Sequence, residues 1–215
     1  ATAADITKSG RGTLILSGLN TAGGAARKTT INEGVLQIGD LDNIGGNTGG
    51  LVFAGGVLRL GAGFVDDLST RTISYLPGGG TLDTNGVSLS LANSLGSGAG
   101  GFTKIGAGTL TLNASASYTG PTTLTTGTID VNANNALGVG GNLSIGGGTT
   151  LNVNTFSITH GLVTTSGASP AILGTGTINA SEGFFFNHTG STSIAAVLAG
   201  AGGLLKAQTN TLTLS

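Results

Sequence analysis

Residues 103–131 read TKIGAGTLTLNASASYTGPTTLTTGTIDV, a stretch in which apolar and polar residues alternate. Apolar residues alternate with polar ones over residues 109–112 (Thr-Leu-Thr-Leu) and again over 128–131 (Thr-Ile-Asp-Val), while Gly and Asn interrupt the alternation. The only charged residues in it are Lys104 and Asp130. Apolar residues at every second position predict short strands with one buried face, and the interruptions predict tight turns between those strands.

The composition of the whole chain supports a folded all-β protein. Glycine accounts for 42 of the 215 residues, and only 8% of the residues are charged. A disordered chain would combine low hydrophobicity with high charge, whereas 38% of this chain is apolar. Gly groups such as 78–80 and 146–148 reach positive φ without steric cost and therefore mark corners. No segment carries a capped apolar stripe of helical period, so we predict essentially no long helix.

Charge and hydropathy argue against two classes of partner. The net charge is −1 and the eight Lys and Arg residues are scattered, so no basic patch is present that would bind nucleic acid. No unbroken apolar run approaches the ~18 residues of a transmembrane helix, so we expect no membrane insertion in this segment. Cysteine is absent, which fits passage through an oxidising space. The first ten residues lack an apolar signal core, and we expect any export signal to have been removed or to lie outside this sequence.

A long internal repeat organises the chain. A Lys is followed five places later by a Thr in three copies, which are Lys8/Thr13, Lys104/Thr109 and Lys206/Thr211. The similarity continues downstream, where residues 29–39 match residues 122–132. We therefore predict one domain over residues 1–215, with repeats at about 6–101 and 102–203 and a partial third copy at 204–215.

The repeat favours a parallel β-solenoid over a sandwich or a barrel, because each coil of a solenoid stacks on a similar neighbour. Coils of ~20–25 residues suit the strand and turn spacings. They give about nine or ten coils and, at ~4.8 Å between stacked strands, a rod roughly 45 Å long. Inward Leu, Ile and Val would form stacked ladders, and outward Thr, Ser and Asn would form polar ladders. Stacked like charges would repel, which accounts for the few charged residues.

The repeated motif resembles a known family. Its two complete copies read GRGTLIL and TTINEGVL at residues 10–16 and 29–36, and GAGTLTL and TTLTTGTI at residues 106–112 and 122–129. This pattern is similar to the autotransporter-associated β-strand repeat, also called the passenger-associated transport repeat. The first copy departs from it at residues 21–24, which replace the Tyr-Thr-Gly turn of residues 118–120. The third copy has Gln208 and Asn210 in place of the two glycines.

The resemblance implies a right-handed β-helix in a secreted protein of the bacterial cell surface, where such repeats serve as a scaffold for export and display. A membrane translocator barrel would normally follow in this family. We therefore expect this chain to be a segment of a passenger, a processed passenger, or a subunit with a different export route.

The sequence offers few candidate catalytic residues, and we expect that this chain is not an enzyme. Glycoside hydrolysis needs two carboxylates that face one cleft, and Asp66-Asp67, with Arg71 and Asp83 nearby, is the only adjacent acidic pair. Neighbours on a strand point to opposite faces, so we interpret this pair as a solvated loop.

Histidine and glycine patterns give no further site. His160 and His188 lack a persuasive acid or nucleophile nearby, and we interpret them as surface or turn residues. The Gly-rich turns lack the Asp of calcium-binding repeats and the Lys of a P-loop. We therefore expect no catalytic residue, no metal and no cofactor.

The run Phe184-Phe185-Phe186 is unusual in a chain with so few aromatic residues. Strand geometry sends Phe184 and Phe186 to one side and Phe185 to the other. One interpretation is that two rings fill the core and Phe185 lies under a loop. The other is that Phe185 is an exposed contact for a neighbouring molecule or a surface glycan.

The first and last strands carry the functional hypothesis. A solenoid end exposes unpaired backbone groups that can template another strand, and no polar cap is evident at either end. The candidate end-to-end assembly residues are Ile6, Leu14, Ile15, Leu16, Leu205, Leu212, Thr213 and Leu214. Copies of the chain would then stack head to tail into an extracellular filament, or the chain would form an adhesin stalk that contacts glycans or host and matrix surfaces. The alternatives are an excerpt of a longer autotransporter passenger and, less favoured, a polysaccharide-degrading enzyme.

Overall fold

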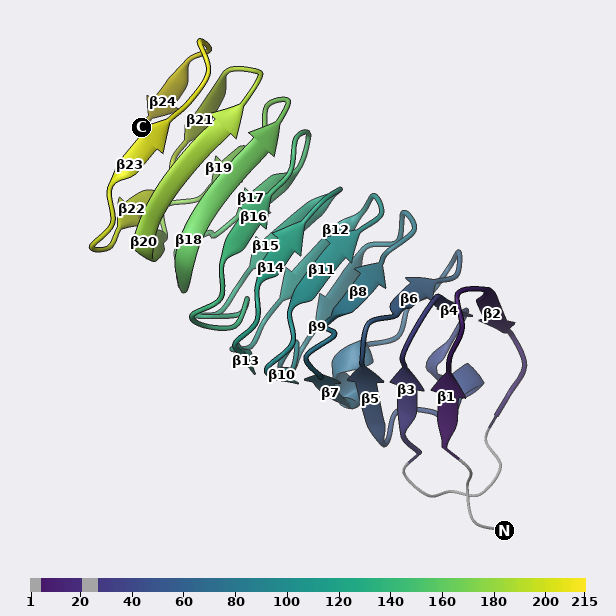
Figure 1. Cartoon of the computed structure of the whole chain (residues 1–215). Helices are drawn as coiled ribbons and strands as arrows, with labels where there is room; N and C mark the ends of the chain where they lie inside the picture. The colour runs from purple at the N-terminus through teal and green to yellow at the C-terminus, as the bar shows by residue number, and fades with distance from the viewer. Residues whose placement is uncertain (1–4, 21–26) are drawn as a thin grey trace.

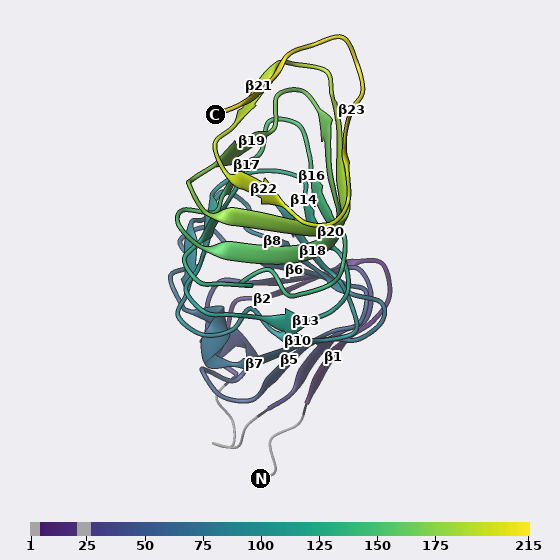
Figure 2. The same cartoon turned by 90° about the vertical axis from the view of Figure 1, so that its left-hand side faces the viewer.

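The computed structural model describes residues 5–20 and 27–215 as an all-β parallel solenoid, which confirms the predicted fold class. Figure 1 shows the coils stacked into a rod with the two termini at opposite ends, and Figure 2 shows the same rod turned by 90°, with its C-terminal end toward the viewer. Short strands form three sheets, called A, B and C here, and each pairing between neighbouring strands is parallel. The departure of the first copy at residues 21–24 lies outside the described residues.

Sheet A covers the N-terminal half of the rod. Its strands, in spatial order, are β1 (Ile6–Lys8), β3 (Thr29–Ile31), β5 (Gly50–Phe53), β7 (Thr72–Tyr75), β10 (Ser97–Gly98) and β13 (Ser117–Tyr118). Two 3₁₀ turns, η1 (Leu41–Ile44) and η2 (Leu68–Thr70), complete the coils in this half. No helix among the described residues is long and apolar enough to cross a membrane.

Sheet B runs along the whole rod, so the number of its levels gives the number of coils. Its strands are β2 (Thr13–Leu16), β4 (Val35–Ile38), β6 (Val57–Leu60), β8 (Gly80–Asp83), β11 (Phe102–Ile105), β14 (Thr122–Leu124), β16 (Leu143–Ile145), β18 (Ser157–Gly167), β20 (Thr177–His188), β22 (Val197–Ala199) and β23 (Leu204–Lys206). Because β22 and β23 both pair with β20, these strands make ten levels. The described chain therefore has ten coils, numbered here from the N-terminal end.

Sheet C covers the C-terminal part of the rod. Its strands, in chain order, are β9 (Leu89–Leu91), β12 (Thr109–Leu112), β15 (Thr128–Val131), β17 (Thr150–Asn152), β19 (Ala171–Leu173), β21 (Thr192–Ile194) and β24 (Leu212–Leu214). Successive coils pair at offsets such as Thr128 with Thr150 and Thr150 with Ala171, which agrees with the predicted coil length.

The side chains alternate as the sequence predicts. Along sheet B, Leu36, Leu58, Leu82, Lys104 and Leu124 occupy successive rungs of one inward ladder. On the outside, Asn132 Nδ2 donates to Asn113 Oδ1 at 3.1 Å and Asn154 Nδ2 donates to Asn132 Oδ1 at 2.8 Å. The inward ladders form one apolar core cluster, and the outward ladders join the coils through side-chain amides.

The repeated motif does not return to the same face of the rod. Lys8 lies on β1 of sheet A and Thr13 on β2 of sheet B. Lys104 lies on β11 of sheet B and Thr109 on β12 of sheet C. The motif at Lys206 also joins sheets B and C, through β23 and β24. The first copy is thus displaced by one face relative to the other two.

Candidate functional site

The two complete motif copies each build one corner from two stacked coils. In the first, β1 and β2 lie under β3 and β4, with Lys8 paired to Ile31 and Thr13 paired to Val35. In the second, β11 and β12 lie under β14 and β15, with Lys104 paired to Leu124. The Lys-containing half of the motif therefore belongs to one coil, and the Thr-Thr-containing half belongs to the next.

The motif lysine turns inward and holds these two coils together. Lys8 Nζ donates to the carbonyl oxygen of Gly10 at 2.5 Å in its own turn and to that of Glu33 at 3.0 Å in the next coil. Lys104 Nζ donates to the carbonyl oxygens of Gly106 at 2.8 Å and Thr126 at 3.1 Å. Both ammonium groups thus bridge the turn of one coil and the turn of the following coil.

Lys104 is fully buried, with a relative exposure of 0%. Its third donor reaches Thr84 Oγ1 at 3.2 Å in the preceding coil. Burial lowers the pKa of Lys104 to about 8, because the ammonium has lost its hydration, and the negative charge of Asp83 partly offsets this. The stem of Lys104 fills the leucine ladder while its head satisfies backbone oxygens at the corner.

We call the two corners closed by Lys8 and Lys104 the lysine corners. A glycine of the following coil covers each of them. Gly34 has a φ of 65° and Gly127 a φ of 80°. A Cβ on Gly34 would lie 2.4 Å from the carbonyl oxygen of Gly12, and a Cβ on Gly127 would lie 2.6 Å from that of Gly108. Both the backbone angle and the contact with the coil below therefore require glycine.

The lysine corner was missed by the sequence prediction, although its signal was present. The Lys recurs at a fixed distance from the motif Thr, and it takes the inward register set by the alternating residues. In the sequence analysis the three Lys residues serve only as markers of the repeat. A Lys is almost never fully buried without a partner. Here the partners are backbone oxygens, which the sequence does not display.

The candidate assembly residues lie in two groups at opposite ends of the rod (Figure 1). Ile6, Leu14, Ile15 and Leu16 lie on β1 and β2 of coil 1, and Leu205, Leu212, Thr213 and Leu214 lie on β23 and β24 of coil 10. Ile15 is 60% exposed and Leu205 is 61% exposed, whereas Ile6 and Leu212 pack against the core.

Phe185 lies on the outer face of β20 and is half-buried. Phe184 and Phe186 point inward, and their rings stack with centroids 5.9 Å apart. Phe185 pairs with Leu205 of the next coil and lines an apolar cleft of about 330 Å³ with Leu205, Leu162 and Glu182.

The acidic pair does not converge on a cleft. Asp66 Oδ2 accepts a hydrogen bond from the amide nitrogen of Leu41 at 2.7 Å. Asp67 Oδ2 accepts one from the amide nitrogen of Ala92 at 3.0 Å, and Asp67 Oδ1 accepts one from that of Ser69. The two carboxylates therefore fasten the loop to the coil on either side of it, and both are half-buried rather than fully solvated.

The charged residues near this pair are also used within the fold. Asp83 forms an ion pair with Arg59, with Nε and Oδ2 2.8 Å apart. Arg71 is buried, and its guanidinium donates to the carbonyl oxygens of Gly46 at 2.6 Å and Gly50 at 3.2 Å.

The interpretation of the two histidines as surface or turn residues is wrong. His160 and His188 lie on strands β18 and β20 and are buried. His188 continues the inward alternation of Phe184 and Phe186, which is the signal that could have located it. His160 Nδ1 contacts the carbonyl oxygen of Gly141 at 3.1 Å, and burial lowers the pKa of His160 to about 4.

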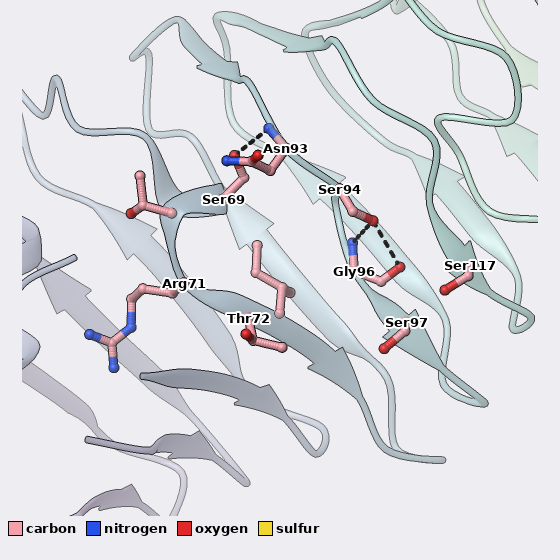
Figure 3. A pocket seen from close by; sticks show the side chains of 10 residues that line it. Ser69, Arg71, Thr72, Asn93, Ser94, Gly96, Ser97 and Ser117 are labelled. Carbon is pink, nitrogen blue, oxygen red and sulfur yellow. Dashed lines mark hydrogen bonds between the residues drawn. The ribbon is translucent and has the colours of Figure 1, made fainter. Parts of the chain in front are cut away.

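A polar cleft of about 340 Å³ lies beside η2 and strands β7 and β10 (Figure 3). The side chains of Ser94, Ser97 and Ser117 line one part of it, while the side chain of Arg71 points away from them. The amide nitrogen of Gly96 donates to Ser94 Oγ at 3.1 Å. The cleft offers hydroxyl groups that can hydrogen-bond a polar ligand. Within residues 5–20 and 27–215, no group of three or more His, Asp or Glu side chains is placed to hold a metal ion.

Comparison with known proteins finds a family match at the residues that form these corners. Residues 6–38 and 102–131 match the Passenger-associated-transport-repeat family, and these ranges cover the two lysine corners with their covering coils. The chain is also 35% identical over 146 residues to the adhesin BmaC autotransporter of Brucella suis biovar 1 (strain 1330). That alignment covers 67% of this chain but only 4% of the adhesin. No solved structure matches. Residues 6–38 and 102–131 therefore carry the passenger-associated transport repeat, and about two thirds of the chain is similar to a short part of an autotransporter adhesin.

Proposed function

We propose that this chain is a non-enzymatic structural element of a bacterial surface adhesin, a rigid β-helical stalk displayed outside the cell. The observation that carries the proposal is the lysine corner, since each family repeat spans two coils that one ammonium group joins. The similarity to an autotransporter adhesin supports the extracellular location. The use of Asp66 and Asp67 as backbone acceptors supports a structural rather than a hydrolytic role.

Surface display tests this proposal. The chain would be joined to an autotransporter translocator barrel, with an epitope tag at its outer end, and expressed on bacteria. We expect export of a folded rod that resists external protease. Lys104→Met should reduce the amount of protease-resistant rod, whereas Lys28→Met, at an exposed lysine, should not. Equal display of the two variants would contradict a role for the corner in the exported scaffold.

A second candidate function is head-to-tail assembly of copies into an extracellular filament. The exposed apolar side chains of Ile15 on coil 1 and Leu205 on coil 10 favour it. Electron microscopy over a dilution series would separate the two functions, because a filament subunit should form fibres and a stalk should remain as short rods. Deletion of residues 204–215 should abolish the fibres and leave a soluble rod, and fibres that persist would exclude this mode of assembly.

We propose that adhesion arises from side-chain contacts at the surface and not from an enzymatic reaction. Phe185 beside Leu205 is the candidate contact for a glycan or for a host or matrix surface. Screening of the purified chain against glycans and matrix proteins, with Phe185→Ser as the matched variant, tests this assignment. Binding that Phe185→Ser leaves unchanged would place adhesion elsewhere, and turnover of a glycan would support the enzyme alternative.

A further inference from the structure

The polar cleft of about 340 Å³ lies where one side of the rod changes its construction. On one side of this boundary, the turn η2 leads into β7 of sheet A through residues 61–71. On the other side, β9 of sheet C leads into β10 through residues 92–96. The longer connection forms a wall of the cleft, and the outer faces of β7, β10 and β13 form its floor (Figure 3). The cleft therefore belongs to the middle of the described rod.

Hydrogen bonds fix the wall of the cleft to the coil beside it. Ser69 is 6% exposed, and its Oγ donates to Asp67 Oδ1 at 2.6 Å and accepts from the amide nitrogen of Asn93 at 2.8 Å. Asp67 Oδ2 accepts from the amide nitrogen of Ala92 at 3.0 Å. Because η2 is thus held against the segment that follows β9, the cleft is formed before a ligand enters. A ligand therefore binds without the cost of ordering the wall.

Four polar side chains in the cleft are free to bond a ligand. They are exposed and, among the described residues, have no hydrogen-bond partner; they are the hydroxyl groups of Thr72, Ser97 and Ser117 and the side-chain amide of Asn93. Ser97 and Ser117 occupy neighbouring rungs of sheet A, about 4.8 Å apart, and Thr72 lies on the strand next to Ser97. A ligand that spans these groups has to carry several closely spaced donors and acceptors of its own.

The residues that line the cleft present no charge to a ligand. The side chain of Arg71 points away from the serines, its terminal nitrogens donate to carbonyl oxygens such as that of Gly46 at 2.6 Å, and its Nε is buried. Ile73, an apolar residue of the lining, is only 5% exposed. An ion or an apolar molecule would therefore find no matching group here, whereas a neutral ligand rich in hydroxyl groups would find four.

The floor of the cleft has no free strand edge with which a peptide would pair. β10 pairs with β7 on one side and with β13 on the other. β13 is covered in turn by the next coil, where the amide nitrogen of Val139 donates to the carbonyl oxygen of Tyr118 at 3.1 Å. An extended peptide binds a sheet mainly by adding a strand to an exposed edge. Recognition at this cleft therefore depends on side-chain hydroxyl and amide groups, which suit a sugar better than a peptide.

We infer that this cleft is a binding site for a neutral saccharide, held by the four free side chains described above. Its volume lies at the lower end of the ~300–1,000 Å³ that is typical of small-molecule sites, which fits a short stretch of glycan. The inference rests on the surface role proposed above and gives the rod a ligand site apart from Phe185. Because no charged side chain takes part, binding should hardly depend on ionic strength.

Titration of the purified chain with neutral trisaccharides of glucose, galactose and mannose tests the inference. Amide shifts in NMR spectra locate the bound sugar, and their concentration dependence gives the Kd. The test variant combines Ser97→Ala with Ser117→Ala and removes two of the four ligand groups. The matched control is Ser166→Ala, at an exposed serine of β18 that lies outside the cleft. A trisaccharide that carries sialic acid and a Ser-Gly peptide serve as comparison ligands.

At least one neutral trisaccharide should shift the amides of Ser97 and Ser117, with a Kd on the order of 1 mM. The double variant should bind it roughly tenfold more weakly, because two neutral hydrogen bonds are lost. Ser166→Ala should bind like the wild type. The Kd should change by less than about twofold between low and high salt, since no ion pair is formed.

Unchanged binding by the double variant would overturn the inference, and so would equal weakening by Ser166→Ala. The absence of amide shifts with every neutral trisaccharide at its solubility limit would also overturn it. Tighter binding of the sialylated trisaccharide would point to a charged ligand, and equal shifts with the peptide would point to a peptide; either result would overturn the neutral saccharide. None of these outcomes affects the exported scaffold, which the display of Lys104→Met tests separately.

Discussion

At the scale of single residues, the fold depends on a few buried polar side chains that bond to backbone oxygens. Lys104 is the clearest case, because it lies in a ladder of leucines and yet has a partner for each of its three donors. Its acceptors come from three consecutive coils. The removal of such a side chain leaves buried oxygens without donors, a larger loss than the bond itself contributes.

Lys104→Met tests the contribution of this ammonium group. The variant keeps the stem in the core but leaves the carbonyl oxygens of Gly106 and Thr126 unpaired. We expect the free energy of unfolding to fall by about 2 kcal/mol, since the lost pairing outweighs the relief of burying a charge. Urea unfolding measures it, with Lys28→Met expected within about 0.5 kcal/mol of wild type. Equal stability of the two variants would mean that Lys104 contributes only its apolar stem.

His160 makes the stability depend on pH. Its pKa falls from 6.5 to about 4 in the folded chain, so below pH 6.5 the unfolded chain binds a proton that the folded chain does not. Stability therefore falls as the pH decreases from about 6.5 to about 4, by up to about 3 kcal/mol. Urea unfolding of wild type and His160→Gln over this range isolates the effect, because the variant lacks the titrating group. Parallel pH profiles for the two proteins would contradict it.

At the scale of the element, the unit of this protein is a corner and not a single strand. Strands of three or four residues are too short to fix their own register, and the corner supplies the missing constraint. A lysine closes the turn of one coil, and a glycine lets the next coil approach it closely. This explains why the family repeat is longer than one coil.

Gly127→Ala tests the close approach of coil 6 to the lysine corner. Gly148 provides a matched control, since its φ of 70° resembles that of Gly127 but a Cβ there would meet no described atom within 4 Å. Gly148→Ala should cost roughly 1–2 kcal/mol through its left-handed backbone alone. Gly127→Ala should cost about 1–3 kcal/mol more, because the Cβ also displaces the carbonyl of Gly108. Equal unfolding midpoints for the two variants would show that the coils separate freely at this corner.

The sequence predicted most of the elements and few of the corner contacts. The alternation at residues 109–112 and the repeat of the Lys-to-Thr spacing predicted stacked strands, because both depend on local pattern. The inward direction of Lys104 and His160 was missed, because it depends on backbone oxygens in neighbouring coils. The long strands β18 and β20 were also missed, since a shift in register between His160 and Leu162 joins two segments that elsewhere are separate.

At the scale of the whole molecule, the ten coils form one apolar core, but each coil contacts mainly its neighbours. Such a rod should tolerate the loss of a complete coil, because the strands on either side can meet in the same register. It should not tolerate the loss of part of a coil, which would turn inward-facing residues outward.

Deletion of residues 128–149 tests this tolerance. Thr128 pairs with Thr150 and Thr109 with Thr128, so the deletion brings Thr150 onto Thr109 and leaves the corner of Lys104 and Gly127 intact. We expect a folded rod shorter by about 4.8 Å in small-angle X-ray scattering. Deletion of residues 128–138, about half a coil, is the control and should abolish cooperative unfolding. Loss of the fold in both deletions would mean that the coils are not interchangeable.

The displacement of the first motif copy by one face has a consequence for what surrounds the rod. Viewed down the long axis, the corner at Lys8 points in a different direction from the corners at Lys104 and Lys206, although all three have similar sequences. A loop grafted after Leu16 and the same loop grafted after Leu112 would face different sides. A displayed rod of this kind therefore presents its repeats to neighbours in more than one direction, and even spacing along the chain does not become a single stripe along the surface.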